Sequence, residues 1–124
     1  SSCVRRSRSN TSLQSLALLN ETQRMETSRK LAGRLLREAG DDEERLRLLF
    51  TLLASRKPTD SERNTCEQLL NIERTRFAQD KEAAAALLSI GEASRDTELD
   101  VTEHAAWTQL AVTVLASDLA ILLY

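Results

Sequence analysis

Three closely spaced arginines near the start of the chain, Arg5, Arg6 and Arg8, are the side chains whose type and spacing best suit ligand binding. The planar guanidinium group donates paired hydrogen bonds to phosphate, sulfate or carboxylate groups, and nearby amide side chains can add further contacts. The sequence therefore predicts a tentative polar binding patch in this region. Its members are Arg5, Arg6, Arg8, Asn10, Gln14 and Asn20.

The same arginines could instead pair with acidic residues of this protein. Residues 1–40 hold eight basic and three acidic residues, whereas residues 41–124 hold nine basic and 16 acidic residues. This uneven charge favours a basic N-terminal segment that lies on an acidic body. Nucleic-acid binding is less favoured, because no aromatic side chains are interleaved for base stacking and the net charge of the chain is −2. We expect no nucleic-acid partner.

The single histidine and the two cysteines do not form a recognisable metal or catalytic pattern. His104 follows Asp100 and Glu103, but one histidine with two carboxylates lacks the converging ligands that a metal site needs. We therefore expect His104 at the surface, near the start of a helix. Cys3 and Cys66 have neither zinc nor haem spacing, and they could form a disulfide or remain one buried and one partly exposed thiol.

Sequence motifs for catalysis are also missing from the chain. No phosphate-binding loop, dinucleotide-binding loop or serine-hydrolase elbow occurs in the 124 residues. The sequence thus predicts no catalytic, cofactor-binding or metal-binding residues in this segment, and it favours a protein that is not itself an enzyme.

Composition predicts an all-α fold. The chain holds 22 Leu and 15 Ala, against three Gly, one Pro and four aromatic residues. This balance favours helices over sheets, and the length suits one compact domain. We expect a single helical domain over residues 1–124, a compact bundle of about five to six unequal helices. Residues 1–10 would form an extended, irregular lead-in, and residues 11–124 would be helical.

Capping residues and apolar periodicity place six helices along the chain. Four of them are expected at about 12–20, 22–39, 60–78 and 81–90. The third helix of the chain should begin at about residue 42 and end before Pro58, and the last should run from about residue 101 onward. Gly40 and Gly91 are expected to end the second and fifth of these helices. The side chains expected on the buried faces of the second to fourth helices are Leu31, Ala32, Leu35, Leu36, Ala39, Leu46, Leu49, Phe50, Leu53, Cys66, Leu69, Leu70 and Phe77.

The last helix is apolar on nearly every side from Ala105 onward, and the chain ends in an apolar run at 119–124. A span over 105–124 would be long enough to cross a bilayer, but Asp118 and several other polar residues interrupt it. A helix in a core or against a partner is therefore favoured, with Trp107 as a core anchor. The abrupt apolar end suggests a C-terminal fragment of a larger protein, which could also form a homo-oligomer through this helix.

The most distinctive stretch is Cys-Val-Arg-Arg-Ser-Arg-Ser-Asn-Thr-Ser-Leu-Gln-Ser-Leu-Ala-Leu-Leu-Asn at residues 3–20. It resembles the C-R-x-R-S-N-T-P-L-Q-A-L-x-L-L-N signature near the C-terminal end of a planctomycete-specific domain family of unknown function. Weaker resemblances follow in order, at residues 29–39, 56–58, 91–93 and 105–108, so they extend over nearly the whole chain. Ser12 stands where the family usually has Pro, and residues 116–119 keep only the Asp of a polar Asn-x-Asp-Glu cluster.

The resemblance implies a large secreted or periplasmic parent protein with a companion planctomycete domain upstream, often together with a cytochrome-c-like domain. Haem is therefore expected elsewhere in the parent and not in this segment. The resemblance implies no known reaction. The leading hypothesis is a structural or domain-docking module whose partners are other domains of the parent chain. The alternative is a part of an extracellular enzyme that acts on polysaccharide or another anionic substrate.

Overall fold

A computed structural model describes residues 20–91 and 96–122, and within these ranges it contains five α-helices and no strand. The helices are α3 (Glu21–Glu38), α4 (Asp42–Ala54), α5 (Asp60–Gln79), α6 (Lys81–Leu88) and α7 (Val101–Leu122). The predicted all-α bundle is confirmed. The lead-in expected over 1–10 and the helix expected over 12–20 lie outside the described residues.

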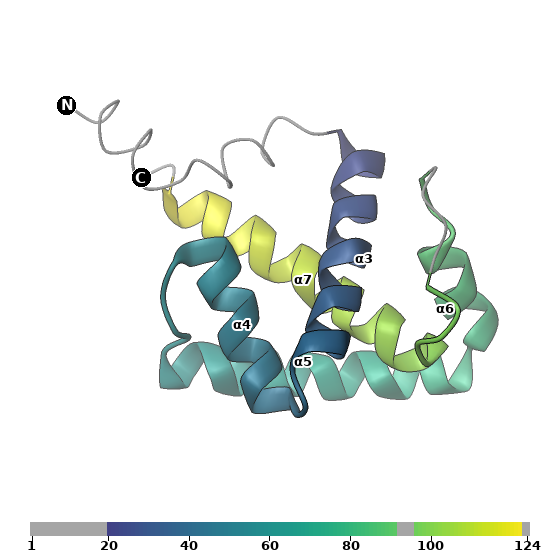
Figure 1. Cartoon of the computed structure of the whole chain (residues 1–124), viewed down its shortest axis with the longest axis horizontal. Coiled ribbons are helices and arrows are strands. Elements are labelled where there is room, and N and C mark those ends of the chain that lie inside the picture. The colour runs from purple at the N-terminus through teal and green to yellow at the C-terminus, as the bar shows by residue number, and fades with distance from the viewer. Residues whose placement is uncertain (1–19, 92–95, 123–124) are drawn as a thin grey trace.

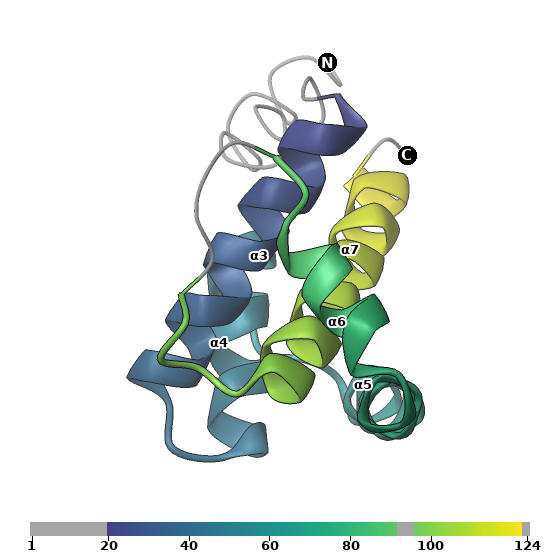
Figure 2. The same ribbon diagram turned by 90° about the vertical axis from the view of Figure 1, so that its right-hand side faces the viewer.

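Helix α7 lies at the centre of the bundle, and the other helices pack around it. Its main neighbours are α3, α5 and α6, and α4 packs against both α3 and α7. Helix α3 crosses α7 in Figure 1 and lies beside it in Figure 2, whereas α5 runs along the base in Figure 1 and is seen end-on in Figure 2. A helix that is apolar on most sides gains most from this central position, because each of its faces can be covered by a neighbour.

The side chains of α7 supply the middle of the hydrophobic core. Trp107 is fully buried, as the sequence predicted, and so are Ala105, Ala106, Leu110 and Ala111. The small alanine side chains allow the neighbouring helices to approach the α7 backbone closely. The buried faces predicted for α3, α4 and α5 are confirmed, except that three of their leucines are only partly buried: Leu31, Leu36 and Leu69.

Side-chain caps fix where the helices begin. At α5, the predicted capping box is present: the Glu62 backbone amide donates to Thr59 Oγ1 at 3.1 Å, and the Thr59 amide donates to Glu62 Oε1 at 2.8 Å. Asp41 and Asp80 accept hydrogen bonds from the first turns of α4 and α6 in the same way. Each cap satisfies a backbone N–H group that has no partner within its own helix.

Two helices end earlier than predicted: α3 at Glu38, and α6 at Leu88 with Ser89 as its C-cap, so Gly91 does not end α6. Helix α3 ends at Glu38 with Ala39 as an extended C-cap, so Gly40 follows the helix without supplying a left-handed turn. Among the described residues, positive φ angles occur at Ser55 (59°) and Gly91 (93°). At Gly91 a Cβ atom would lie 2.9 Å from a Glu26 carboxylate oxygen, so glycine allows the chain after α6 to approach α3.

Candidate functional site

The polar patch predicted at the N-terminus falls almost entirely outside the described residues. Arg5, Arg6, Arg8, Asn10 and Gln14 lie outside them, so the patch stays a prediction. Asn20 is described, and it caps α3: its Oδ1 accepts from the Gln23 amide at 2.8 Å, and its own amide donates to Gln23 Oε1 at 3.1 Å. Asn20 therefore has a structural role at the start of a helix.

Cys66 lies on the buried face of α5, as expected from its place in the helical pattern. Cys3, with which Cys66 could form a disulfide, lies outside the described residues. The disulfide between them therefore stays a hypothesis.

His104 is buried, with 2% of its surface exposed, and the expectation of a surface histidine is wrong. It occupies the first turns of α7 but faces α3, where its Nε2 lies 2.9 Å from the backbone carbonyl oxygen of Arg29. Because that oxygen can only accept, Nε2 must carry the proton and donate it. His104 thus fixes α7 to α3.

Arg29 is the second buried polar side chain at this junction, with 1% of its surface exposed. Its Nη1 donates to the carbonyl oxygens of Leu88, at 2.6 Å, and Ile90, at 3.0 Å. The last carbonyl groups of a helix lack partners within it and carry partial negative charge, so the guanidinium group acts as a C-terminal cap for α6. The sequence does not predict this role, but one signal points to a buried Arg29: it falls on the apolar stripe of α3 between Met25 and Ala32.

Arg74 joins three helices through four hydrogen bonds to two carboxylates. It donates from Nε and Nη2 to the Glu103 oxygens, both at 2.7 Å, and from Nη1 and Nη2 to the Asp42 oxygens at 2.8 and 2.9 Å. The hydrogen bond from Arg74 lowers the pKa of Asp42, and the hydrogen bonds to Glu103 and Asp42 raise the pKa of Arg74. Asp42 and Arg74 therefore stay charged at neutral pH, and the hydrogen bonds of Arg74 connect the first turns of α4 and α7 to α5.

A second bidentate pair lies where α4 passes into α5. Arg56 donates from Nη1 and Nη2 to the two Glu62 oxygens at 2.7 and 2.8 Å, and its guanidinium carbon lies 5.6 Å from the centre of the Phe50 ring. The hydrogen bond from Arg56 is the main reason why the pKa of Glu62 falls from 4.5 to about 2. Glu62 therefore supports both the cap of α5 and the loop before it.

The Glu62 pair should make folding stability depend on pH. Because the pKa of Glu62 is lower in the folded chain, the carboxylate stabilises the fold above about pH 4.5, and this contribution is lost as the pH falls toward 2. We expect Glu62→Gln to lower the free energy of unfolding by about 1 kcal/mol at pH 7, a modest value because solvent screens the pair. Near pH 2 the substitution should lower it by almost nothing. Urea titrations of both proteins at pH 7, 4.5, 3 and 2 measure the difference.

Arg56→Met supplies the matched control for this prediction. Without the guanidinium group, most of the pH-dependent difference between Glu62 and Glu62→Gln should disappear. A penalty for Glu62→Gln that is equal at pH 7 and pH 2 would contradict the interpretation.

Three half-open hollows lie on the described surface. The first, about 330 Å³, lies between α3, α7 and the end of α6, and we call it the α3–α7 groove; its lining is Glu21, Thr22, Arg24, Met25, Ile90 and Val112. The second, about 180 Å³, lies between α4, α5 and α7 and is lined by Phe50, Leu69 and Val114 among others. The third, about 350 Å³, lies beside the C-terminal half of α3 and is bordered by basic side chains, and we call it the basic hollow.

Neither a cluster of metal ligands nor a membrane-spanning helix occurs within the described ranges. Residues 20–91 and 96–122 contain no group of three or more His, Cys, Asp or Glu side chains placed to hold a metal ion. In the same part of the chain, no helix is long and apolar enough to cross a membrane.

Comparison with known proteins identifies one family. The family model described as "Protein of unknown function (DUF1553)" matches residues 1–70, which is more than half of the chain. The match ends within α5, so α6, α7 and the weaker resemblances at 91–93 and 105–108 lie beyond it. No curated protein and no solved structure matches the chain.

Proposed function

This chain belongs to the DUF1553 family of proteins of unknown function, and we propose that it is a non-catalytic helical module that docks against other domains of a longer, secreted parent protein. Secretion and the multidomain parent rest on the planctomycete-type resemblance of residues 3–20. The docking role rests on the structure of the α3–α7 groove.

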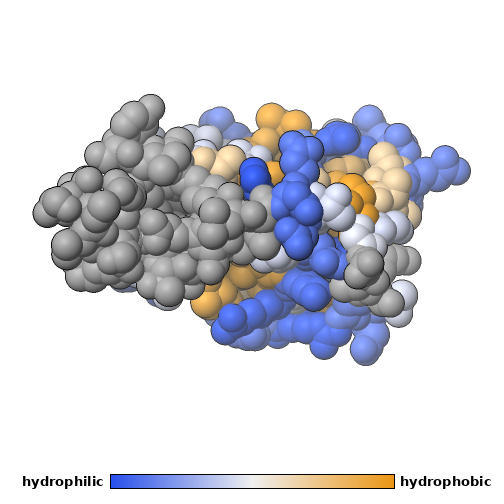
Figure 3. Space-filling view, turned by 90° about the horizontal axis from the view of Figure 1, so that it is seen from above, coloured by the Kyte–Doolittle hydropathy of each residue, from blue (hydrophilic) through white to orange (hydrophobic). Residues whose placement is uncertain are grey.

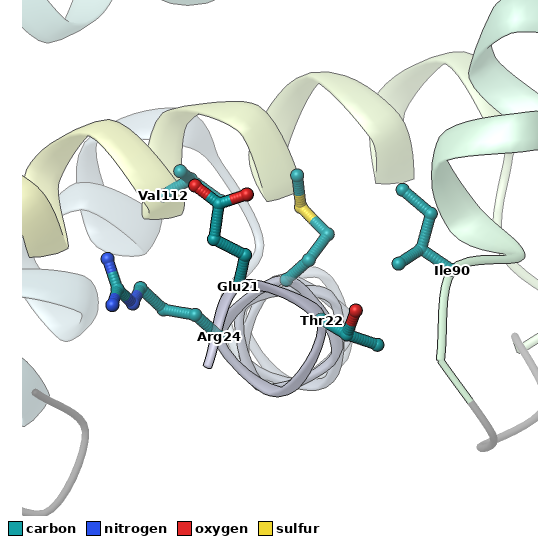
Figure 4. Close-up of a pocket in the computed structure, with 6 residues that line it drawn as sticks. Glu21, Thr22, Arg24, Ile90 and Val112 are labelled. Atoms are coloured by element: carbon teal, nitrogen blue, oxygen red, sulfur yellow. The ribbon is translucent and has the colours of Figure 1, made fainter. Parts of the chain in front are cut away.

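The α3–α7 groove is the observation that carries the proposal. Figure 4 looks along α3: Glu21 points toward α7 beside Val112, Thr22 points toward Ile90, and Arg24 extends on the side away from Ile90. Met25, Ile90 and Val112 give the groove its apolar lining, and Glu21 and Arg24 add charged groups to it. Protein–protein contacts commonly combine apolar and polar surface in this way.

The exposed apolar surface fits a small contact between domains. Among the described residues, the large hydrophobic side chains that stay exposed are Ile90, at 36%, and Ile72, at 62%. The top face in Figure 3 accordingly shows separate hydrophobic areas among hydrophilic side chains. Contacts between domains of one chain are smaller and more polar than those of obligate dimers, so this surface suits docking within a parent protein.

The buried polar side chains support a structural role for the module. His104 and Arg29 hold α3, α6 and α7 together, and Arg74 connects α4, α5 and α7. Two of the helices that they connect, α6 and α7, lie beyond the residues that match the family model. We infer that the matched segment and the following residues fold as one unit, since α3 and α4 pack on α7.

Titration calorimetry tests the docking role. This chain and the neighbouring domains of the full-length protein are produced separately, and their binding to each other is measured. We expect Ile90→Asp to weaken binding by at least about tenfold, because it places a charge in the apolar part of the contact. Ile72→Asp is the matched control, as it makes the same change at an exposed isoleucine on α5 outside the groove, and it should weaken binding by less than about twofold.

Circular dichroism melts of both variants check that each one still folds. If the wild-type chain does not bind its neighbours, or if the two variants weaken binding equally, the docking role is wrong.

The alternative function, as part of an extracellular enzyme that acts on polysaccharide or another anionic substrate, depends on Arg5, Arg6, Arg8 and the amides that follow. These residues lie outside the described part of the chain. Homo-oligomerisation through α7 likewise stays a prediction.

A further inference from the structure

The basic hollow lies where α3 meets the segment that leads into α7. Residues 96–100 run alongside the C-terminal half of α3 in Figure 2, and Asp96 of this segment forms an ion pair with Arg37. The hollow measures about 350 Å³, and its basic lining consists of Arg29, Lys30, Arg34 and Arg37. It shares no lining residue with the α3–α7 groove, so it is a separate feature of the surface.

The inner wall of the hollow is polar and held rigidly. Arg29 and His104 both line it, although only 1% and 2% of their surfaces are exposed. The Arg29 guanidinium is fixed by the carbonyl oxygens of Leu88 and Ile90, and the His104 ring is fixed by the carbonyl oxygen of Arg29. A ligand would therefore meet groups that are already in place, which reduces the entropy lost on binding.

The rim carries more positive than negative charge. Lys30, Arg34 and Arg37 follow one another at spacings of four and three residues, which places them on one face of α3. Arg34 donates from Nε to Glu38 at 2.7 Å, and Arg37 pairs with Asp96. No carboxylate within the described ranges lies within 4.0 Å of the Lys30 amine, so this charge faces the hollow without an acidic partner there.

Gly33 keeps the inner wall open. A glycine inside a helix is less favourable than an alanine, so its presence in the middle of α3 calls for a reason. Close packing does not supply one: a Cβ atom at this position would lie 3.5 Å from His104 Nε2 and 3.6 Å from the Leu99 side chain, both ordinary contact distances. Gly33 is one of the residues that line the hollow, and a side chain there would take up space on the inner wall, against the His104 ring and Leu99.

We propose that the basic hollow binds a small organic anion through a carboxylate or sulfate group, with Lys30 and Arg34 as the charged contacts and Gly33 leaving room for the ligand. A volume of about 350 Å³ is in the range of small-molecule sites and well above that of a single inorganic ion. Ammonium and guanidinium groups such as those of Lys30 and Arg34 on the rim are the donors that recognise such oxyanions. The site is independent of the docking role, because it uses none of the same side chains.

Nuclear magnetic resonance titration of the ¹⁵N-labelled chain tests the site, with galacturonate as the probe, galactose as its uncharged counterpart and sodium sulfate as an inorganic anion. We expect galacturonate to shift the amide signals of Lys30, Gly33 and His104 in a saturable way, and galactose to leave them unchanged. Lys30→Gln should weaken galacturonate binding by about tenfold, because it removes a charge-assisted contact. Arg63→Gln is the matched control on α5, and it should weaken binding by less than about twofold.

Gly33→Ala adds a test that does not depend on charge. Its methyl group fills part of the inner wall without a clash, and alanine favours the helix more than glycine does, so the variant should melt at the same or a higher temperature and still bind galacturonate several-fold more weakly. Four results would overturn the proposal: no saturable shifts with galacturonate, equal shifts with galactose, binding of sulfate alone, or equal losses in Lys30→Gln and Arg63→Gln.

Discussion

Replacing Arg29 with methionine is expected to lower the free energy of unfolding by about 3 kcal/mol or more. Methionine can occupy much of the same space, but it has no donor for the carbonyl oxygens of Leu88 and Ile90, which accept from Arg29 at 2.6 and 3.0 Å. Each buried carbonyl left without a partner costs about 1–3 kcal/mol, and the positive charge at the end of α6 is lost as well. Urea unfolding followed by circular dichroism at pH 7 measures the change.

Arg34→Met is the matched control for this prediction, because it makes the same substitution on the same helix. The Arg34 side chain is 51% exposed and pairs with Glu38, one turn along α3. An exposed pair of this kind contributes about 0.5 kcal/mol or less. Equal losses in the two variants would show that Arg29 does not act as the cap of α6.

The local features of this fold could be predicted from the sequence because they depend on residues only three or four positions apart. The capping box of Thr59 and Glu62 and the apolar stripe of α4 are patterns of this kind, and the structure has both. The box of Asn20 and Gln23 has the same spacing, and recognising it would have placed the start of α3 correctly. The buried position of Trp107 follows equally from its small apolar neighbours.

The contacts that hold the helices to one another could not be predicted in this way. Arg29 is 59 positions from Leu88, and Arg74 is 32 positions from Asp42 and 29 from Glu103. Each of these charged residues fits an exposed helix position equally well, so only the packing of the helices shows which carboxylate or carbonyl it meets. His104 was placed at the surface for the same reason: its buried partner is a backbone carbonyl, which no sequence pattern marks.

The basic hollow was missed for a related reason. Arg5, Arg6 and Arg8 stand out in the sequence because they are close together, whereas Lys30, Arg34 and Arg37 come together only through the turn of a helix. An uneven charge distribution thus indicated that the N-terminal part of the chain is basic, but it did not indicate which basic residues border a cavity.

Trp107 should respond very differently to two substitutions. Trp107→Ala is expected to lower the free energy of unfolding by about 3–5 kcal/mol, the usual cost of removing a large buried aromatic side chain. Trp107→Phe should cost only about 1 kcal/mol, because two effects oppose each other. Phenylalanine leaves a small cavity, but it also removes the indole N–H, which is buried and has no acceptor within the described part of the chain.

Urea unfolding followed by circular dichroism compares the three proteins. In the wild type, fluorescence gives an independent readout, since Trp107 is the single tryptophan and its emission should shift to longer wavelength as the core opens. Leu110→Ala, one turn further along α7 and equally buried, shows what a purely apolar truncation costs at this depth in the core. If Trp107→Phe costs as much as Trp107→Ala, the indole N–H has a partner in the folded chain, and α7 is held at this point by a polar contact as well as by apolar packing.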